Sequence, residues 1–210
     1  MNKFLSLVTL SFVSALSFAS ITLNVTGQIS GQKANINVKH FGNSRTWGAG
    51  PFSGNFGNGP SFKMYCVDLD HSVSPPSSYQ VDPLYIPGLA LSDRHHWAMK
   101  LYNKFAPGVD NSTKGAALQM AIWEVMVDGN GDLFNGNFKD NGTTSSIRNL
   151  AASYLATDLT NVSDEGYWLK SVTHPNGKNQ DMIGPVPEPA SLSALGLGAL
   201  GLLRRRAKKA

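Results

Sequence analysis

The strongest constraint on how this chain folds comes from its two ends, which have the composition of export and membrane signals. Residues 1–19 carry a lysine at position 3, continue as an apolar run, and finish with the small residues Ser17 and Ala19. This order is typical of a secretory signal peptide, so we expect signal peptidase to cut after Ala19. The exported domain is then residues 20–184. That length is enough for one domain with its own hydrophobic core.

The C-terminal end combines three parts in a fixed order: Pro187, Glu188 and Pro189; an apolar stretch at 190–203; and the cluster of Arg204, Arg205 and Arg206. The stretch is shorter than the roughly 20 residues that span a bilayer, and the arginines would stay on the cytoplasmic side. This order resembles the PEP-CTERM sorting signal of Gram-negative bacteria over residues 185–210, although two lysines follow the arginines. An ordinary membrane anchor is the alternative, but it leaves the Pro-Glu-Pro sequence unexplained.

The PEP-CTERM resemblance implies a route through the cell. The membrane enzyme exosortase removes such tails, so the tail would anchor the protein only transiently in the inner membrane. The mature protein would reach the cell envelope, the outer surface or an extracellular polysaccharide matrix. Whether it stays anchored or is released is left open.

The net charge of +4 belongs largely to the two ends. Six of the 18 basic residues and one of the 14 acidic residues lie in the leader or the tail, which leaves the exported domain at −1. No basic patch remains for a nucleic-acid backbone. We therefore expect no nucleic-acid partner, and contact with the membrane only through the C-terminal segment.

The first half of the domain alternates apolar and polar residues, as half-buried strands do. We predict strands at 21–25, 34–38 and 62–69, and hairpin turns with irregular edge strands across the glycine-rich stretch 41–60. The second half has helical spacing. We predict helices from Ser92-Asp93 to about Phe105, from a Ser112 cap to Val127, and from Ser145 or Ser146 onward.

Two short strands complete the expected fold, at 167–172 and near Met182, with a turn at 175–177 between them. The pattern predicts an α+β domain, an antiparallel β sandwich or barrel with a compact helical insertion.

Two residues in this domain have unusual settings. Cys66 is the only cysteine of the chain and lies inside a predicted strand, whereas exported cysteines usually occur in pairs. Gln119 lies in the middle of a helix that is apolar nearly all round. A buried amide without partners costs about 1–3 kcal/mol. Either Gln119 makes an ordinary hydrogen bond to the backbone, or it is no longer an amide.

The sequences Tyr65-Cys66 and Leu118-Gln119-x-x-Ile122-Trp123 resemble the thioester domains of bacterial surface adhesins. That resemblance implies a bond between Cys66 Sγ and Gln119 Cδ, formed with loss of ammonia. It also implies a pocket in which Tyr65, Trp97 and Trp123 keep water out. The family commonly has threonine where this chain has Leu118, which affects the tuning of reactivity more than the bond.

A thioester is an activated acyl group that reacts with an amine to give a stable amide. We therefore expect a surface or matrix protein that attaches covalently to amine nucleophiles. It would act once per molecule, as an adhesin and not as an enzyme, without a cofactor. The target is left open between a protein lysine, a polyamine and a glycan hydroxyl.

Three alternatives stay open beside this interpretation. The first is a non-reactive structural component of an exopolysaccharide or biofilm matrix, with an ordinary thiol. The second is a calcium-dependent glycan-binding module that uses Asp128, Asn130 and Asp132, although Leu133 and Lys139 stand where an EF-hand needs Gly and Glu. The third, and weakest, is a cysteine hydrolase that pairs Cys66 with one of the histidines at 71, 95, 96 or 174. We expect no metal pair from the adjacent histidines at 95 and 96.

Overall fold

Antiparallel strands and three helices make up the part of the chain that the computed structural model describes, residues 20–88, 93–172 and 179–185. The predicted signal peptide, the turn at 175–177 and the sorting segment from residue 186 lie outside the described residues. The expected α+β fold with a barrel and a helical insertion is confirmed.

Six strands close into an antiparallel barrel in the order β1-β4-β5-β9-β8-β6. Their bounds are β1 Ile21–Gln28, β4 Phe52–Phe56, β5 Phe62–Cys66, β6 Ser77–Tyr85, β8 Tyr167–Ser171 and β9 Met182–Gly184. Closure pairs every one of these strands on both sides and so removes exposed sheet edges. Leu23, Met64, Val81 and Leu169 from four of these strands are buried in the core.

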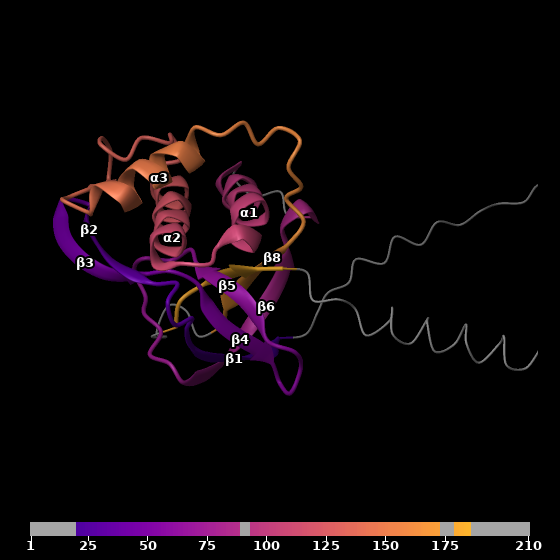
Figure 1. Ribbon diagram of the computed structural model, residues 1–210. Coiled ribbons are helices and arrows are strands. Elements are labelled where there is room, and N and C mark those ends of the chain that lie inside the picture. The colour runs from indigo at the N-terminus through magenta and orange to yellow at the C-terminus, as the bar shows by residue number, and fades with distance from the viewer. Residues whose placement is uncertain (1–19, 89–92, 173–178, 186–210) are drawn as a thin grey trace, which may run out of the picture.

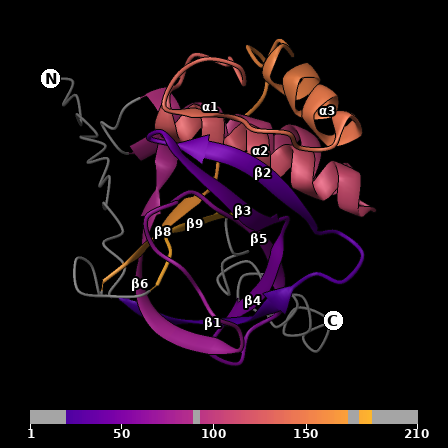
Figure 2. The same ribbon diagram turned by 90° about the vertical axis from the view of Figure 1, so that its left-hand side faces the viewer.

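A second sheet is formed mainly by the segment of the chain between β1 and β4. It consists of β2 (Ala34–His40), β3 (Asn43–Ala49) and the short β7 (Phe138–Asp140), in the order β3-β2-β7. In Figure 2, β2 and β3 form a long ribbon that runs beside the helices. The glycine-rich stretch 41–60, where we expected hairpin turns and irregular edge strands, contains two regular strands, β3 and β4, that are held by pairing with their neighbours.

The helical insertion lies between β6 and β8 and covers one side of the barrel (Figure 1). It contains α1 (Asp93–Phe105), α2 (Ser112–Val127) and α3 (Ser145–Leu155), with short 3₁₀ turns at Ile86–Gly88 and Ala106–Gly108. The central helix, α2, is buried along most of its length, as its apolar sequence predicts. The first two helices begin and end within two residues of the predicted positions, and the third begins at Ser145, as predicted.

Two local predictions need correction. The strand that we expected at 62–69 ends at Cys66. Beyond it the chain turns, because the Asp68 carboxylate accepts a hydrogen bond from the Asp70 N–H at 2.9 Å. The N-cap of α2 is Asn111, whose side chain accepts from the Lys114 N–H at 3.0 Å, and not Ser112.

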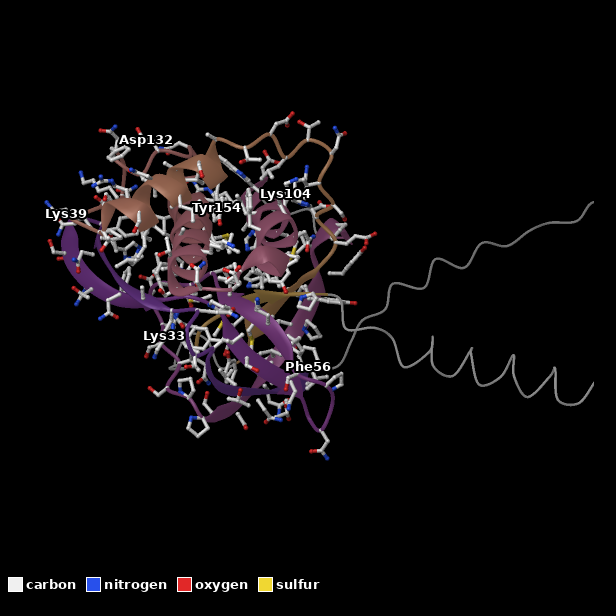
Figure 3. All side chains as sticks on the ribbon, in the orientation of Figure 1. Lys33, Lys39, Phe56, Lys104, Asp132 and Tyr154 are labelled. Atoms are coloured by element: carbon white, nitrogen blue, oxygen red, sulfur yellow. The ribbon has the colours of Figure 1, made fainter. Side chains whose placement is uncertain are left out.

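A close approach at Gly115 presses α2 against the segment before β2. Any side chain at this position would collide with the backbone carbonyl of Gln32 and with Pro51. Lys33, labelled in Figure 3, follows Gln32 and lies directly before β2.

Candidate functional site

The residues Cys66 and Gln119 meet where the barrel contacts the helical layer. Cys66 is the last residue of β5 and Gln119 lies in the middle of α2. Each is only 1% exposed. The two residues that the sequence singled out are therefore in contact, although 53 positions separate them in the chain.

Two reciprocal hydrogen bonds hold the Gln119 carboxamide against the Cys66 backbone. The Cys66 N–H donates to Gln119 Oε1 at 3.2 Å, and Gln119 Nε2 donates to the Cys66 carbonyl at 2.7 Å. The pair satisfies the buried amide and also the last backbone groups of β5 on this side. The carbonyl carbon of Gln119 is thereby fixed beside the residue that carries the thiol.

The thiol itself is buried. Cys66 Sγ donates to the backbone carbonyl of Asp68 at 3.0 Å. Burial raises the pKa of the Cys66 thiol to about 12, and interactions with the Trp123 indole and the Asp68 backbone offset only part of this rise. The Trp123 indole N–H lies near the thiol but outside hydrogen-bond geometry to any acceptor among the described residues. A thiol in this state is inert toward reagents in bulk solvent.

A cavity of about 450 Å³ opens beside Cys66, between β1, the β2–β3 ribbon, α2 and the loop after β5. Its described lining residues are Thr26, Gly27, Gln28, Lys33, Trp47, Gly48, Phe52, Cys66, Leu69, His71, Ser72, Val73, Pro75, Trp123 and Gln180. The volume falls in the range of small-molecule sites. We call it the Cys66 cavity.

Of the three aromatic residues predicted to shield the thiol, Trp123 alone lines this cavity. Its ring is 3% exposed and meets Trp47 edge-on, with ring centroids 5.6 Å apart. Tyr65 is buried elsewhere, edge-on to Tyr102 of α1 with ring centroids 6.0 Å apart. Trp97 lines a separate hollow together with His96. The structure therefore does not bring Tyr65 and Trp97 to the Cys66 cavity.

Trp47 was missed by the sequence analysis, and it lines the cavity opposite Trp123. It lies in the glycine-rich stretch that we expected to form irregular edges. The detectable signal was local: Ala34-Asn35-Ile36 and Thr46-Trp47-Gly48 both alternate, which would have placed the Trp47 ring on the face of a hairpin.

The histidines that the hydrolase alternative invoked have different fates. His71 lines the Cys66 cavity, and its Nδ1 lies 2.6 Å from Asp68 Oδ2. His96 Nδ1 lies equally close, at 2.6 Å, to Asp164 Oδ2 in the loop before β8. His95 packs on the Trp168 ring at 4.5 Å between centroids. The histidine at position 174 lies outside the described residues.

The acidic loop after α2 uses its oxygens on the backbone. Asp128 accepts from the Phe138 N–H at 2.8 Å, Asn130 accepts from the Asp132 N–H at 2.8 Å, and Asp132 accepts from the Phe134 N–H at 2.9 Å. Figure 3 shows Asp132 at the outer edge of the helical layer. Over residues 20–88, 93–172 and 179–185 no three histidine, cysteine or acidic side chains gather as a metal site.

Comparison with known proteins gives one match for the C-terminal segment and one for the exported domain. The family model of the PEP-CTERM protein-sorting motif matches residues 185–207, which include the Pro-Glu-Pro sequence and the three arginines. The chain carries a PEP-CTERM sorting motif. The motif marks an exported protein, and it implies processing by exosortase and export to the surface of a Gram-negative bacterium. In the described residues, no helix has the length and apolar character needed to cross a membrane.

Among solved structures, the exported domain is similar to the N-terminal thioester domain of the fibronectin-binding protein SfbI from Streptococcus pyogenes. The match has a TM-score of 0.41 and 14% sequence identity, and covers 66% of this chain and 87% of that chain. No curated protein matches the sequence.

Proposed function

We propose that this exported protein forms an internal thioester between Cys66 Sγ and Gln119 Cδ and uses it to couple covalently to a nucleophile outside the cell. The observation that carries the proposal is the placement of the Gln119 carboxamide against the Cys66 backbone in a buried junction. The sequence resemblance to thioester domains at these same two residues supports it.

The hydrogen bonds suit the formation of that bond. When the sulfur attacks Cδ, negative charge develops on Gln119 Oε1, which already accepts from the Cys66 N–H. A fixed donor aimed at a developing oxyanion is a common source of acyl-transfer rate enhancement. The Sγ–Cδ bond forms, the Cδ–Nε2 bond breaks, and the thiol proton leaves with the nitrogen as ammonia.

Burial then preserves the product. Cys66 and Gln119 are each 1% exposed, and the Trp47 and Trp123 rings pack edge-on in the lining of the cavity beside Cys66, which limits the access of water to the bond. The stored acyl group is released once, when a nucleophile attacks Cδ and the thiol is restored. The protein is therefore an adhesin that acts a single time and not a turnover enzyme. The proposed site of attachment is an extracellular matrix, because the sorting motif directs the protein to the cell surface.

Intact mass, measured before and after methylamine, tests this proposal. The exported protein should weigh one ammonia less than its mapped termini require, and methylamine should add to it in one-to-one ratio. Titration of the thiol in the folded state does not decide the matter, because burial raises the pKa of the Cys66 thiol to about 12 and an ordinary thiol would also be silent.

The control is Cys66→Ala. Succinimide formation at an Asn-Gly pair, such as Asn130-Gly131 or Asn141-Gly142, also expels one ammonia, so a mass deficit alone is insufficient. Cys66→Ala keeps the backbone groups that pair with Gln119 and should show the full sequence mass. A deficit of the same size in this variant would show that the deficit of the wild type does not come from a thioester.

A second function is favoured by one observation. The Gln119 carboxamide is fully used as a clamp on the β5 backbone, and a clamp needs no chemistry. If the wild-type protein has its full mass and methylamine adds nothing, the protein is a non-reactive structural component that is sorted to the cell surface.

A further inference from the structure

Lys33 gives the Cys66 cavity a positive charge that has no partner. It lines the cavity just before β2, and its side chain is exposed. The Lys33 ammonium group makes no ion pair and no hydrogen bond with the residues that the structure describes. The described lining contains no aspartate and no glutamate. The charge therefore favours a ligand that carries an anionic group.

One wall of the cavity is aromatic. Trp47 and Trp123 both line it, and their ring centroids lie 5.6 Å apart. Trp123 is only 3% exposed, whereas Trp47 is partly exposed, so a ligand in the cavity meets the Trp47 ring first. An indole ring packs well against a flat apolar surface. The C–H groups on one face of a sugar ring form such a surface.

Hydrogen-bonding groups complete the lining. The Ser72 hydroxyl lines the cavity and has no hydrogen-bond partner in the described part of the chain. Gln28 and Gln180 each donate from the amide nitrogen to a backbone carbonyl, at 2.9 Å and 2.8 Å. Neither amide oxygen receives a hydrogen bond from a described residue. The cavity thus offers both a hydroxyl donor and amide acceptors to the hydroxyl groups of a ligand.

We propose that the Cys66 cavity binds the uronic acid residues of an acidic polysaccharide, with Trp47 against the sugar ring and Lys33 paired with the sugar carboxylate. A uronic acid combines the three features that the lining favours, an apolar ring face, hydroxyls and a carboxylate. The volume of about 450 Å³ suits a small ligand or a short segment of a sugar chain.

The proposed binding is reversible and separate from the thioester. Gln119 does not line the cavity, so the sugar forms no bond with its side chain. The lining residues are the same whether the Cys66 thiol is free or bonded. The exported protein would therefore be retained by an acidic polysaccharide even if it had no reactive group.

The two main contacts come from one rigid ribbon. Trp47 of β3 pairs with Ile36 of β2, and Lys33 lies three residues before Ile36. Three residues of extended chain span about 10 Å, which one sugar ring and a flexible lysine side chain can bridge together. The close approach of the Gln32 carbonyl to Gly115 of α2 fixes the backbone next to Lys33.

Calorimetric titration of the exported protein tests the inference. The probes are the acidic disaccharides of glucuronate, galacturonate and mannuronate, each compared with its carboxyl-reduced, neutral form. At least one acid should bind, and about 10-fold more tightly than its neutral form. Lys33→Met should remove this preference for the acid. Trp47→Leu should weaken the binding of the acid by about 10-fold or more.

Lys39→Met and Trp97→Leu are the matched controls. Lys39 lies farther along β2 and does not line the cavity, and Trp97 lines a different hollow. Both variants should bind the acidic disaccharide like the wild type. Thermal unfolding, followed by circular dichroism, shows whether each variant is folded. Triglutamate is the probe for an acidic peptide, and it should bind more weakly than the acidic sugar.

The outcomes separate this inference from the proposed function. Failure of all three acids to bind, or equal binding of the acids and their neutral forms, would overturn it. An unchanged preference in Lys33→Met would overturn the role of that lysine, and tighter binding of triglutamate would assign the cavity to an acidic peptide. The lack of an ammonia deficit would remove the thioester and leave the sugar site intact.

Discussion

Two histidine–aspartate pairs in this protein have the same geometry in different surroundings. Each has an Nδ1 to Oδ2 distance of 2.6 Å, and the His71 and His96 side chains are 25% and 27% exposed. His71 shares its cavity with the buried thiol and with Trp123, whereas the hollow of His96 is lined by the charged residues Asp93, Lys100 and Asp158 around Trp97.

The two pairs, alike in geometry and exposure, therefore differ only in the residues around them. In the Cys66 cavity the His71–Asp68 pair lies close to the buried Cys66 thiol and the Trp123 ring. In the hollow beside Trp97 the His96–Asp164 pair joins the start of α1 to the loop before β8. The first lies beside the proposed thioester, and the second is a surface contact of small energetic value.

The largest effect should come from removing the clamp between the two layers. In a Cys66→Ala background, where no thioester forms, Gln119→Leu should lower the free energy of unfolding by about 2–4 kcal/mol, because two buried backbone groups at residue 66 lose their partners. Thr157→Val, a polar-to-apolar change beside Trp97, should cost about 0.5 kcal/mol. Urea unfolding measures the free energy of unfolding of both variants. Equal losses in the two variants would contradict the claim that the Gln119 hydrogen bonds hold the two layers together.

The fold was largely predictable because local signals agreed with tertiary packing. The apolar sequence of α2, with a capping residue before it and Asp128-Gly129 after it, predicts its bounds almost to the residue. The strand that carries Cys66 was predicted too long, because nothing in the alternation at 67–69 reveals the turn that Asp68 makes with its own loop. The strands at 43–49 and 52–56 were predicted only as irregular edge strands, because the glycines in this stretch interrupt the alternation of apolar and polar residues.

The candidate site was predictable only where chemistry marks single residues. A lone exported cysteine and an amide inside an apolar helix stand out in any sequence, and the structure brings them together. The aromatic residues that cover the thiol were harder to predict. A tryptophan at helical spacing indicates that its ring is packed, but it does not indicate which residues the ring packs against. Trp97 and Trp123 both fit the expectation, and only the folded structure shows that their rings line different hollows.

Exchanging those two tryptophans for phenylalanine gives an effect of intermediate size. Trp123→Phe should lower the free energy of unfolding by about 1–3 kcal/mol, because its buried ring packs on Trp47 and on Phe138. It should also shorten the lifetime of the ammonia deficit, since water gains access to the thioester. Trp97→Phe should cost less than about 1 kcal/mol and leave that lifetime unchanged. Thermal unfolding and timed intact-mass measurements follow the two effects, and a shorter lifetime in Trp97→Phe would argue against the separation of the two hollows.

The smallest effect belongs to the surface pair itself and depends on pH. The hydrogen bond from His96 holds the pKa of Asp164 below its ordinary range, so the folded state favours the ionised carboxylate. This contribution is present above the ordinary carboxyl pKa and is lost as the pH falls through the lowered value. Because solvent screens the pair, removing it with His96→Gln should cost no more than about 0.5 kcal/mol near pH 6, and nothing near pH 2. Urea unfolding of both proteins at the two pH values measures the difference, and the ion pair of Asp110 with Lys114 is an internal reference common to both. A difference that persists undiminished in acid would show that His96 stabilises the protein by packing and not through Asp164.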